Sequence, residues 1–305
     1  MALGDLFTLL GSEIEDPDEE TFLLFSQDIP SQNLGFVDSQ ATTIDLSIGG
    51  KDYTVHQSPT LLNRPGSTTG AVIWKITPLV ASWLSSPDNP LWKTGALSSS
   101  SAVLELGCGV SGLVGLVLSP LVSRYVLTDQ TYVARLVEKN LDENIRAPPK
   151  PSQKRRGKSS SSSSSSPSTA CPANLRFAAL DWELDEVTAS LTGSPDIGSF
   201  DAVIACDCIY NDTLIGPLVQ TCADACNLRR RRGREHSPRG DGVTVSTLCI
   251  VAQQLRDSEI FEGWIKEFGR HFHVWRVPEE ALSKELRANT GFVVHVGILK
   301  TESAP

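Results

Sequence analysis

The stretch AVLELGCGVSGLVG, residues 102–115, joins a continuous apolar run to a glycine-rich turn and then to a second apolar run. The first five residues predict a buried β-strand, and the residues from Leu113 onward predict a helix. Gly107, Gly109 and Gly112 match the G-x-G-x-x-G pattern of nucleotide-binding turns, in which the backbone approaches a ligand and the helix N-terminus receives an anion. The stretch therefore predicts a parallel α/β sheet with a ligand site beyond this strand.

One carboxylate, Glu105, stands two residues before the first glycine and discriminates between cofactors. A dinucleotide pyrophosphate beside it would meet like charge, whereas S-adenosylmethionine brings an α-ammonium and a sulfonium that an acid attracts. The carboxylate of S-adenosylmethionine also suits the free N–H groups at a helix start. We therefore expect the turn to bind S-adenosylmethionine, with a glycine-rich turn that holds no ligand as the alternative.

The chain beyond this turn alternates strand-like and helical patterns, which is typical of a parallel α/β sheet. Seven strands are predicted, at residues 102–106, 124–128, 175–179, 202–206, 244–251, 272–277 and 292–299. Helices are predicted at residues 113–119, 131–144, 212–229 and 258–270, with a short one at 279–286. The last strands predict a hairpin-like return. We therefore predict a Rossmann-like seven-stranded α/β sheet of the class I methyltransferase type, rather than the paired mononucleotide halves of a dehydrogenase.

Residues before this core predict an extension. Alternating apolar residues at 44–48 and 52–56, on either side of Gly49, Gly50 and Lys51, predict a β-hairpin. Residues 75–83 predict a helix, in which Pro78 falls in the first turn. We divide the chain into an acidic N-terminal segment at 1–40, a hairpin and helix at 41–98, and a methyltransferase core at 99–300.

Two stretches, 147–172 and 229–241, interrupt the predicted core. The first carries Lys154, Arg155 and Arg156 and a run of eight serines, a composition with nothing to bury, and predicts a disordered loop. The second begins with four consecutive arginines. Either basic cluster could serve nuclear localisation or contact RNA, but solvated insertions between sheet elements are the favoured interpretation.

The composition restricts the classes of binding partner and the compartment that we expect for this protein. The net charge of -9 argues against general affinity for nucleic acid and suits a basic protein partner. The first twenty residues lack a basic region, and the longest apolar run, 113–118, is too short to cross a bilayer. We expect a soluble protein in the cytoplasm, with the nucleus left open by the basic clusters. Seven cysteines without paired zinc-knuckle spacing predict reduced, mostly buried thiols and no metal site.

Acidic and aromatic residues follow the second and third predicted strands. Asp129 lies 20 residues beyond Gly109, the spacing at which nucleotide-binding folds place an acid that accepts ribose hydroxyls. Its structural alternative is a cap for the helix that starts at Thr131. Trp182, after the third strand, is placed to pack on an adenine ring, with core packing as the alternative.

The fourth predicted strand is followed by Asp207 and Tyr210. Because the carboxyl ends of parallel strands meet at one edge of the sheet, both residues should lie where a donor methyl group points. The next helix begins later, near Asp212, which leaves Asp207 free for substrate rather than needed as a cap. Trp74, before the 75–83 helix, either packs or closes the methionine end of the site with a cation-attracting ring.

With these residues in place, the chain resembles the seven-β-strand protein-lysine methyltransferases, and most closely the fungal ribosomal lysine methyltransferase 5 family. The resemblance is carried by VLELGCGVSGLVG, YVLTDQTYVARLVEKN, LDWE, IACDCIYNDTLIGPLVQTC and TGFVVHVGIL. It implies methyl transfer from S-adenosylmethionine to a lysine of a ribosomal protein of the L1 type, and it makes Asp207 and Tyr210 the catalytic Asp-x-x-Tyr pair. It implies cofactor contacts at Trp74, Gly107, Cys108, Gly109, Asp129, Trp182 and Ala205, to which the charge argument adds Glu105.

The expected reaction is in-line attack by a neutral lysine amine on the sulfonium methyl group. Because an unperturbed lysine has a pKa near 10.4, holding it neutral at pH 7 costs about 4.6 kcal/mol. A desolvated channel and the sulfonium charge would lower that pKa, whereas Asp207 would raise it. We therefore expect Asp207 to recruit and orient the ammonium rather than to act as a strong base.

Two other functions stay open at this stage. An NAD-dependent oxidoreductase could use the same glycine turn, although Glu105 and the Asp207–Tyr210 pair argue against it. A nonenzymatic adaptor could keep the fold and bind RNA or ribosomes through its basic insertions, with binding that falls steeply as salt rises.

Overall fold

A computed structural model describes residues 2–30, 35–63, 69–146, 174–236 and 246–301. The predicted insertion at 147–172 lies outside the described residues. No helix in the described ranges is long and apolar enough to span a membrane.

Seven strands form the central sheet in the order β5-β4-β3-β6-β7-β9-β8, and β9 runs antiparallel to both of its neighbours. The strands are β3 (Ala102–Leu106), β4 (Arg124–Asp129), β5 (Leu175–Ala179), β6 (Ala202–Cys206), β7 (Leu248–Gln254), β8 (Phe272–Arg276) and β9 (Phe292–Leu299). The Rossmann-like seven-stranded sheet with a hairpin-like return is therefore confirmed. The strand order reverses between β3 and β6, which is where open α/β sheets bind ligands, beyond the carboxyl ends of the strands.

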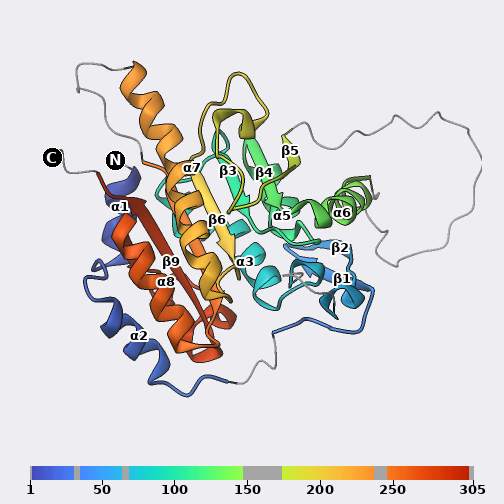
Figure 1. Cartoon of the computed structure of the whole chain (residues 1–305), viewed down its shortest axis with the longest axis horizontal. Helices are drawn as coiled ribbons and strands as arrows, with labels where there is room; N and C mark the ends of the chain where they lie inside the picture. The colour runs from blue at the N-terminus through green and yellow to red at the C-terminus, as the bar shows by residue number, and fades with distance from the viewer. Residues whose placement is uncertain (1, 31–34, 64–68, 147–173, 237–245, 302–305) are drawn as a thin grey trace, which may run out of the picture.

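Helices cover both faces of the sheet (Figure 1). On one face lie α3 (Ile76–Ser85), α5 (Leu113–Leu118) and α6 (Ala134–Arg146), and on the other lie α7 (Ile215–His236) and α8 (Ser258–His271). A short α4 (Pro90–Lys93) precedes β3. Strand β3 is buried along its whole length, and alternate residues enter two separate cores: Val103 packs on the α5 side, whereas Leu104 packs on the α7 side. Burial on both faces explains why the parallel strands read as continuous apolar runs.

The predicted hairpin is present as β1 (Thr43–Ile48) paired with β2 (Lys51–His56). Gly49 and Gly50 both adopt positive φ, +59° and +79°, as a tight two-residue hairpin turn requires. Two asparagine side chains of α6 fasten the hairpin to the core: Asn140 and Asn144 each pair with the backbone N–H and C=O of one β2 residue, at 2.8 Å. Hairpin and sheet are thus one packed unit.

The segment predicted only as acidic contains two helices, α1 (Ala2–Leu10) and α2 (Pro17–Phe25). Asp16 caps α2 by accepting from the N–H groups of Asp18 and Glu19, and Pro17 occupies its first turn. Helix α2 packs along α8, and Phe7 of α1 stacks on Trp275 of β8 at 4.4 Å between ring centroids. The Asp16-Pro17 pair is a helix-start signal within the segment that was predicted only as acidic.

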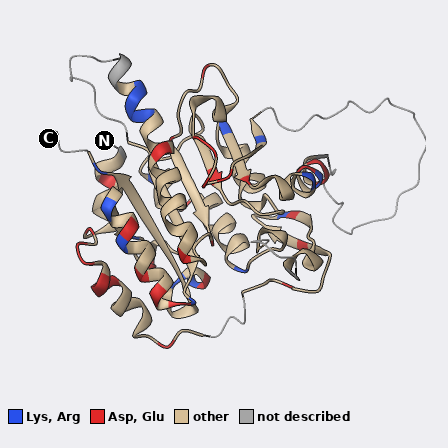
Figure 2. Ribbon diagram, in the orientation of Figure 1, with Lys and Arg blue, Asp and Glu red and all other residues tan. Residues whose placement is uncertain are grey.

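The arginine run is helical, which corrects the predicted insertion at 229–241. Helix α7 continues to His236, and residues 237–241 lie outside the described part of the chain. Arginine is a good helix former, Arg229 pairs with Asp201, and Arg230 donates to the Lys300 carbonyl. Figure 2 shows the resulting basic end of α7.

Two further predictions need correction. The strand expected at 244–251 is β7, which begins and ends later, at Leu248 and Gln254; residues 244 and 245 lie outside the described ranges. The short helix expected at 279–286 is instead two 3-10 turns, Glu279–Ala281 and Lys284–Leu286. Between them Leu282 is extended, and its side chain is buried in the core. The extended backbone at Leu282 separates the two turns.

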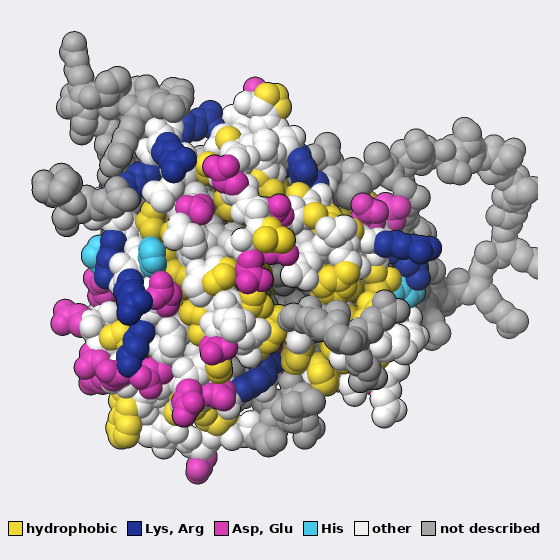
Figure 3. Space-filling view, viewed as in Figure 1, with side chains coloured by type: hydrophobic (Ala, Val, Ile, Leu, Met, Phe, Trp, Pro, Cys, Tyr) yellow, Lys and Arg dark blue, Asp and Glu magenta, His cyan; other side chains and the backbone are white. Residues whose placement is uncertain are grey.

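Figure 3 shows acidic and basic side chains interspersed over the α2 and α8 side of the molecule. Beneath them lies a buried ionic contact: Glu20 of α2 accepts from His295 of β9 at 2.9 Å and faces Arg276 at 3.4 Å. Burial alone would raise the pKa of Glu20, but the His295 hydrogen bond and the charges of His295 and Arg276 outweigh it and lower the pKa below 4.5.

We expect Glu20→Gln to lower the free energy of unfolding by about 3 kcal/mol at pH 7, because it breaks a buried charge contact. A carboxylate with a depressed pKa in the folded state contributes stability above its unfolded pKa and loses it as pH falls through the folded pKa. The difference between wild type and variant should therefore shrink below about pH 4.5. Urea denaturation at several pH values measures this difference in unfolding free energy. A difference that does not change with pH would contradict the lowered pKa of Glu20.

Candidate active site

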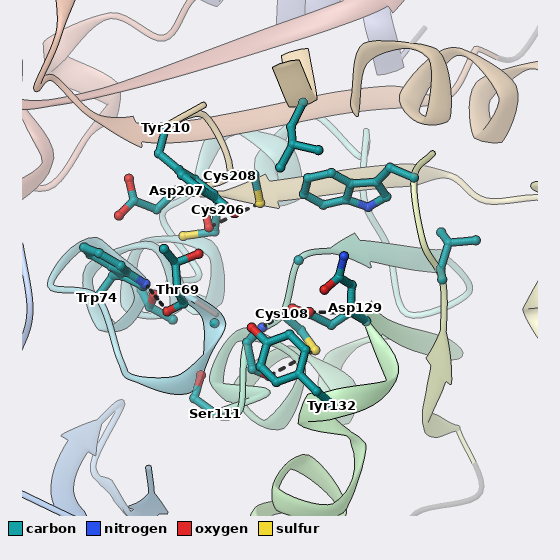
Figure 4. A pocket seen from close by; sticks show the side chains of 18 of the residues that line it. Thr69, Trp74, Cys108, Ser111, Asp129, Tyr132, Cys206, Asp207, Cys208 and Tyr210 are labelled. Atoms are coloured by element: carbon teal, nitrogen blue, oxygen red, sulfur yellow. Dashed lines mark hydrogen bonds between the residues drawn. The ribbon is translucent and has the colours of Figure 1, made fainter. Parts of the chain in front are cut away.

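A cleft of about 780 Å³, including space open to solvent, lies where β3, β4 and β6 end. Four of its lining side chains are carboxylates, from Asp129, Asp181, Glu183 and Asp207, and no lysine, arginine or histidine among the described residues lines it. In Figure 4, Asp207, Tyr210 and Trp74 lie on one side of the cleft, and Asp129 and Tyr132 on the other. Its remaining lining residues are Thr69, Gly70, Val72, Thr77, Gly107, Cys108, Gly109, Ser111, Gln130, Leu180, Trp182, Cys206, Cys208 and Leu214.

The glycine turn forms the floor of the cleft. Gly107 and Gly109 adopt φ of +68° and +58°, in the left-handed region that favours glycine. A Cβ on Gly107 would lie 2.6 Å from the Cys208 Sγ, and one on Gly109 would lie 3.1 Å from the Gly70 carbonyl oxygen. Glycine is therefore required at both positions by the backbone conformation and by the close approach of Cys208 and Gly70.

Asp129 faces the cleft from the end of β4. Its two carboxylate oxygens accept from the N–H groups of Gly109, at 2.8 Å, and Gln130, at 2.7 Å. Gln130, not Asp129, caps the turn that follows, and it does so without a side-chain bond. Burial raises the pKa of Asp129 to about 6, although the two backbone hydrogen bonds lower it. The capping alternative is therefore excluded.

Residues 69–74 form one wall of the cleft, and of these residues only Trp74 was predicted from the sequence. The Gly70 carbonyl accepts from the N–H of Val110 at 2.7 Å, and the Tyr132 hydroxyl hydrogen-bonds with the Gly70 backbone. Burial raises the pKa of Tyr132. Tyr132 comes three residues after Asp129 at the same strand end, a position that could have marked it as a candidate.

Trp182 lies where the sequence predicted, over the glycine turn. A Cβ on Gly107 would come within 3.3 Å of its ring, and its indole N–H is buried without a hydrogen-bond partner. A buried donor without a partner in a cleft wall is unfavourable unless a ligand supplies an acceptor. Adenine nitrogens are acceptors of this kind.

Asp207 is not free, contrary to the sequence prediction. Its carboxylate forms two hydrogen bonds with the Arg256 guanidinium, at 2.7 and 2.6 Å, and accepts from the Gln254 N–H at 3.2 Å. The partner was missed because Arg256 lies 49 residues further along the chain. The prediction that Asp207 is not a helix cap agrees with the structure, since Asn211 caps the next turn.

Trp74 also has a partner already. Its ring lies under the Arg256 guanidinium, 4.9 Å from the ring centroid, and its indole N–H donates to the Thr69 carbonyl at 3.1 Å. The cation-attracting face that was expected to close the methionine end therefore contacts an arginine of the same chain. Trp74 still lines the cleft.

Two predicted cofactor contacts, Glu105 and Ala205, do not line the cleft. Glu105 faces the α5 side of the sheet because side chains alternate along β3, and the Tyr125 hydroxyl donates to it at 2.7 Å. Burial raises the pKa of Glu105 to about 7, and the nearby Asp129 charge adds to the increase. Ala205 is buried inside β6 on the other face. The acids that do line the cleft, and not Glu105, are therefore the groups that would attract the positive charges of the cofactor.

The six cysteines within the described ranges are all buried free thiols, as predicted for those positions. Cys108, Cys206 and Cys208 line the cleft, and burial raises the pKa of each well above 9. They are therefore neutral thiols at physiological pH and contribute packing rather than charge.

Comparison with known proteins now identifies the family. A sequence profile described as lysine methyltransferase matches residues 57–154. A protein named ribosomal lysine N-methyltransferase 5 from Zygosaccharomyces rouxii is 30% identical over 236 residues, which cover 70% of each chain. The chain belongs to the ribosomal lysine N-methyltransferase 5 family. The family member from Kluyveromyces lactis is 27% identical over 313 residues, covering 88% of this chain and 91% of its own.

Another relative carries a different name. A protein of Schizosaccharomyces pombe named diaminohydroxyphosphoribosylamino-pyrimidine deaminase is 29% identical over 277 residues, and this chain spans 56% of its length. Zinc deaminases that act on nucleobases carry H-x-E and P-C-x-x-C patterns. This sequence contains neither pattern, and its described residues hold no metal-binding group of His, Cys, Asp and Glu. The deaminase name is therefore not carried over.

Two solved methyltransferase structures match this chain weakly. The N-methyltransferase NodS from Bradyrhizobium japonicum, in complex with S-adenosyl-L-homocysteine, has a TM-score of 0.38 at 12% identity, covering 70% of this chain and 90% of its own. Magnesium protoporphyrin IX methyltransferase from Synechocystis has a TM-score of 0.39 at 11% identity, covering 74% and 79%. The family assignment rests on the sequence relatives.

Members of the ribosomal lysine N-methyltransferase 5 family are lysine methyltransferases with S-adenosylmethionine as methyl donor. The residues present fit that cofactor. The glycine floor admits a close backbone approach, the Trp182 N–H lacks an acceptor, and the acidic lining suits a cation.

Proposed function

We propose that this protein transfers a methyl group from S-adenosylmethionine to a lysine side chain of a ribosomal protein of the L1 type. The observation that carries the proposal is an acidic cleft with a glycine floor and no basic side chain among its described lining residues. The carboxylates of Asp129, Asp181 and Glu183 in this lining attract a sulfonium and an incoming lysine, and they repel a pyrophosphate. We also propose that the protein acts in the cytoplasm, with nuclear import through Lys154, Arg155 and Arg156 as the alternative.

The cofactor would be held by residues on both sides of the cleft. Asp129 would accept the ribose hydroxyls, the backbone of Gly107 to Gly109 would face the methionine part, and Trp182 would pack against the adenine. When bound, S-adenosylmethionine supplies a methyl group that its positively charged sulfur has already activated for attack by an amine. The protein is therefore left to position the amine and to let it lose its proton.

The lysine would enter beside Tyr210 and Asp207, on the opposite side of the cleft from Asp129 (Figure 4). Tyr210 is 37% exposed, which suits a residue that meets an entering side chain. Solvent reaches this side of the cleft, so the proton that leaves the ammonium can pass to water. The resemblance of Asp207 and Tyr210 to the Asp-x-x-Tyr pair of lysine methyltransferases supports the same assignment.

The proposal is tested by incubating the protein with radiolabelled S-adenosylmethionine and purified ribosomal subunits, and mapping the label by mass spectrometry. We expect label on one or more lysines of the L1-type protein, and no label with the Asp129→Ala variant. An exposed acid outside the cleft offers the matched control: Asp88→Asn should label as the wild type does. Label on another protein would overturn the substrate assignment, and no label with subunits or free ribosomal proteins would overturn the activity.

A nonenzymatic adaptor remains the second candidate, favoured by the arginines at the end of α7. The structure gives two of them internal roles, in the Arg229 contact with Asp201 and the Arg230 contact with the Lys300 carbonyl. Strong, salt-sensitive binding of ribosomal RNA without methyl transfer would favour the adaptor.

A further inference from the structure

Arg256 is a charged residue beside the cleft for which the proposed reaction has so far given no role. It follows β7 by two residues, just as Asp207 follows β6 directly, and β6 and β7 are parallel neighbours. The two side chains therefore leave the same edge of the sheet and meet there. Their contact is two parallel hydrogen bonds of 2.7 and 2.6 Å, the geometry in which guanidinium and carboxylate match best.

The pair is held from several directions. Asp207 is the single non-glycine residue of the described chain with positive φ, +59°, and its own N–H donates to the Ala252 carbonyl at 2.7 Å. Arg256 also donates to the Gln254 side chain at 2.9 Å and lies over the Trp74 ring. This backbone conformation, which is strained for a residue with a side chain, is retained because these contacts fix it.

Asp207 is closed to an incoming amine in this arrangement. Its side chain is 1% exposed, whereas that of Arg256 is 25% exposed. Figure 4 shows the Asp207 carboxylate turned away from the middle of the cleft. Direct capture of a lysine ammonium by Asp207 would require breaking a buried, bidentate contact, which is strongly unfavourable.

We propose that Arg256 is a positioning residue that fixes the Asp207 carboxylate and balances its charge, so that the lysine amine meets a neutral ion pair and not a bare anion. The inference rests on the proposed methyl transfer. A bare carboxylate near the amine would stabilise the ammonium form, which cannot attack, whereas a balanced pair removes that effect. Trp74 contributes by holding the guanidinium on its ring.

Other titratable groups surround the pair. Cys206 and Cys208 flank Asp207, and burial raises the pKa of both thiols well above 9, which keeps them neutral. Tyr210 follows on the same strand end, Lys75 is next to Trp74 in the chain, and Asp129 and Tyr132 face the pair across the cleft. None of these residues is changed in the comparison below, so their contributions cancel between the variants.

The test compares wild type, Arg256→Gln and Arg256→Lys. The probe is a lysine peptide of the L1-type protein, labelled with ¹³C at the lysine Cε and bound together with S-adenosylhomocysteine. Carbon NMR across a pH titration gives the pKa of the bound amine directly, without turnover. We expect that pKa to rise by one to two units in Arg256→Gln, and to stay within half a unit of wild type in Arg256→Lys, which keeps the charge.

The turnover rate should follow the pKa of the bound amine. In Arg256→Gln, kcat at pH 7 should fall about 10- to 100-fold and recover toward wild type as pH rises, while the affinity for S-adenosylhomocysteine stays within about threefold. The double variant Asp207→Asn with Arg256→Gln removes both charges, and it should restore the wild-type amine pKa. It also carries the test if Arg256→Gln does not fold.

An unchanged amine pKa in Arg256→Gln, or a loss of kcat that is equal at every pH, would overturn the inference. So would a raised amine pKa in the double variant. If the wild type methylates no ribosomal protein, the proposed function fails first. An active wild type with an unshifted Arg256→Gln rejects only the role of Arg256.

Discussion

Replacing Asp129 by Asn is expected to weaken the binding of S-adenosylhomocysteine about 100-fold. The carboxylate receives the Gly109 N–H, which orders the glycine turn, and its remaining acceptor sites face the cleft. An asparagine presents an NH₂ group to one of the two backbone N–H donors, so one of those hydrogen bonds is lost together with a charged acceptor for ribose hydroxyls. Losing two charge-assisted hydrogen bonds costs about 3 kcal/mol of binding free energy, which corresponds to binding about 100-fold weaker.

Calorimetric titration measures this affinity, and Asp88→Asn serves as the control because Asp88 is exposed and pairs with Lys93. Affinity should also depend on pH. Since the pKa of Asp129 is raised to about 6, cofactor binding should weaken as pH falls through 6 in the wild type and should lose that dependence in the variant. Equal affinity in variant and wild type would remove Asp129 from the cofactor site.

Folding of the Asp129→Asn variant can be checked independently. A carboxylate whose folded pKa is raised contributes most to stability below its unfolded pKa, and that contribution is lost as pH rises through the folded pKa of about 6. Removing the buried charge should therefore leave the ligand-free protein at least as stable as the wild type at pH 7.5. A loss of affinity in such a protein cannot be assigned to unfolding.

Replacing Asp207 by Asn is expected to lower kcat by about 100-fold, with the affinity for S-adenosylhomocysteine within about threefold of wild type. The change leaves the Arg256 guanidinium without its anionic partner beside the cleft, where it opposes the positive charge that develops on the attacking amine nitrogen in the transition state. Removing the charge of one member of a buried, hydrogen-bonded ion pair costs about 3 kcal/mol of free energy.

Single-turnover methylation of the L1-type protein gives the rate, and calorimetry gives the affinity. Asp212→Asn is the matched control, because Asp212 is an exposed acid five residues further along the same loop, outside the cleft lining. Near-normal turnover in Asp207→Asn would show that the Asp207–Arg256 pair is structural only.

The sheet was predictable from sequence because its strands are short, largely apolar segments bounded by turns. Strands β3, β5, β6 and β9 have the predicted bounds, whereas β7 was placed too early, since the β-branched residues Thr244, Val245 and Thr247 before Leu248 also favour a strand. The length of α7 was missed for a related reason. Four arginines suggest a solvated loop by charge, but their propensity favours helix, and Asp201 supplies a partner.

The site was predictable where one strand end supplies the residue, and less so where two segments meet. Asp129 and Trp182 lie in the cleft as expected, but the prediction that Asp207 is free was wrong because its partner comes from the next strand of the sheet. The alternation of side chains along β3 alone could have excluded Glu105 as a cleft residue, because its side chain lies on the same face of the sheet as those of Val103 and Tyr125.

The wall that Thr69 and Gly70 contribute also affects how this fold could be shortened. The Gly70 carbonyl accepts a hydrogen bond from Val110, and the Gly109 backbone lies against it, so residues that precede the sheet in sequence close one side of the cleft. A fragment trimmed to begin at β3 would keep every glycine of the turn and still offer a half-open groove. A design that transfers this cleft to another protein scaffold must therefore include residues 69–74.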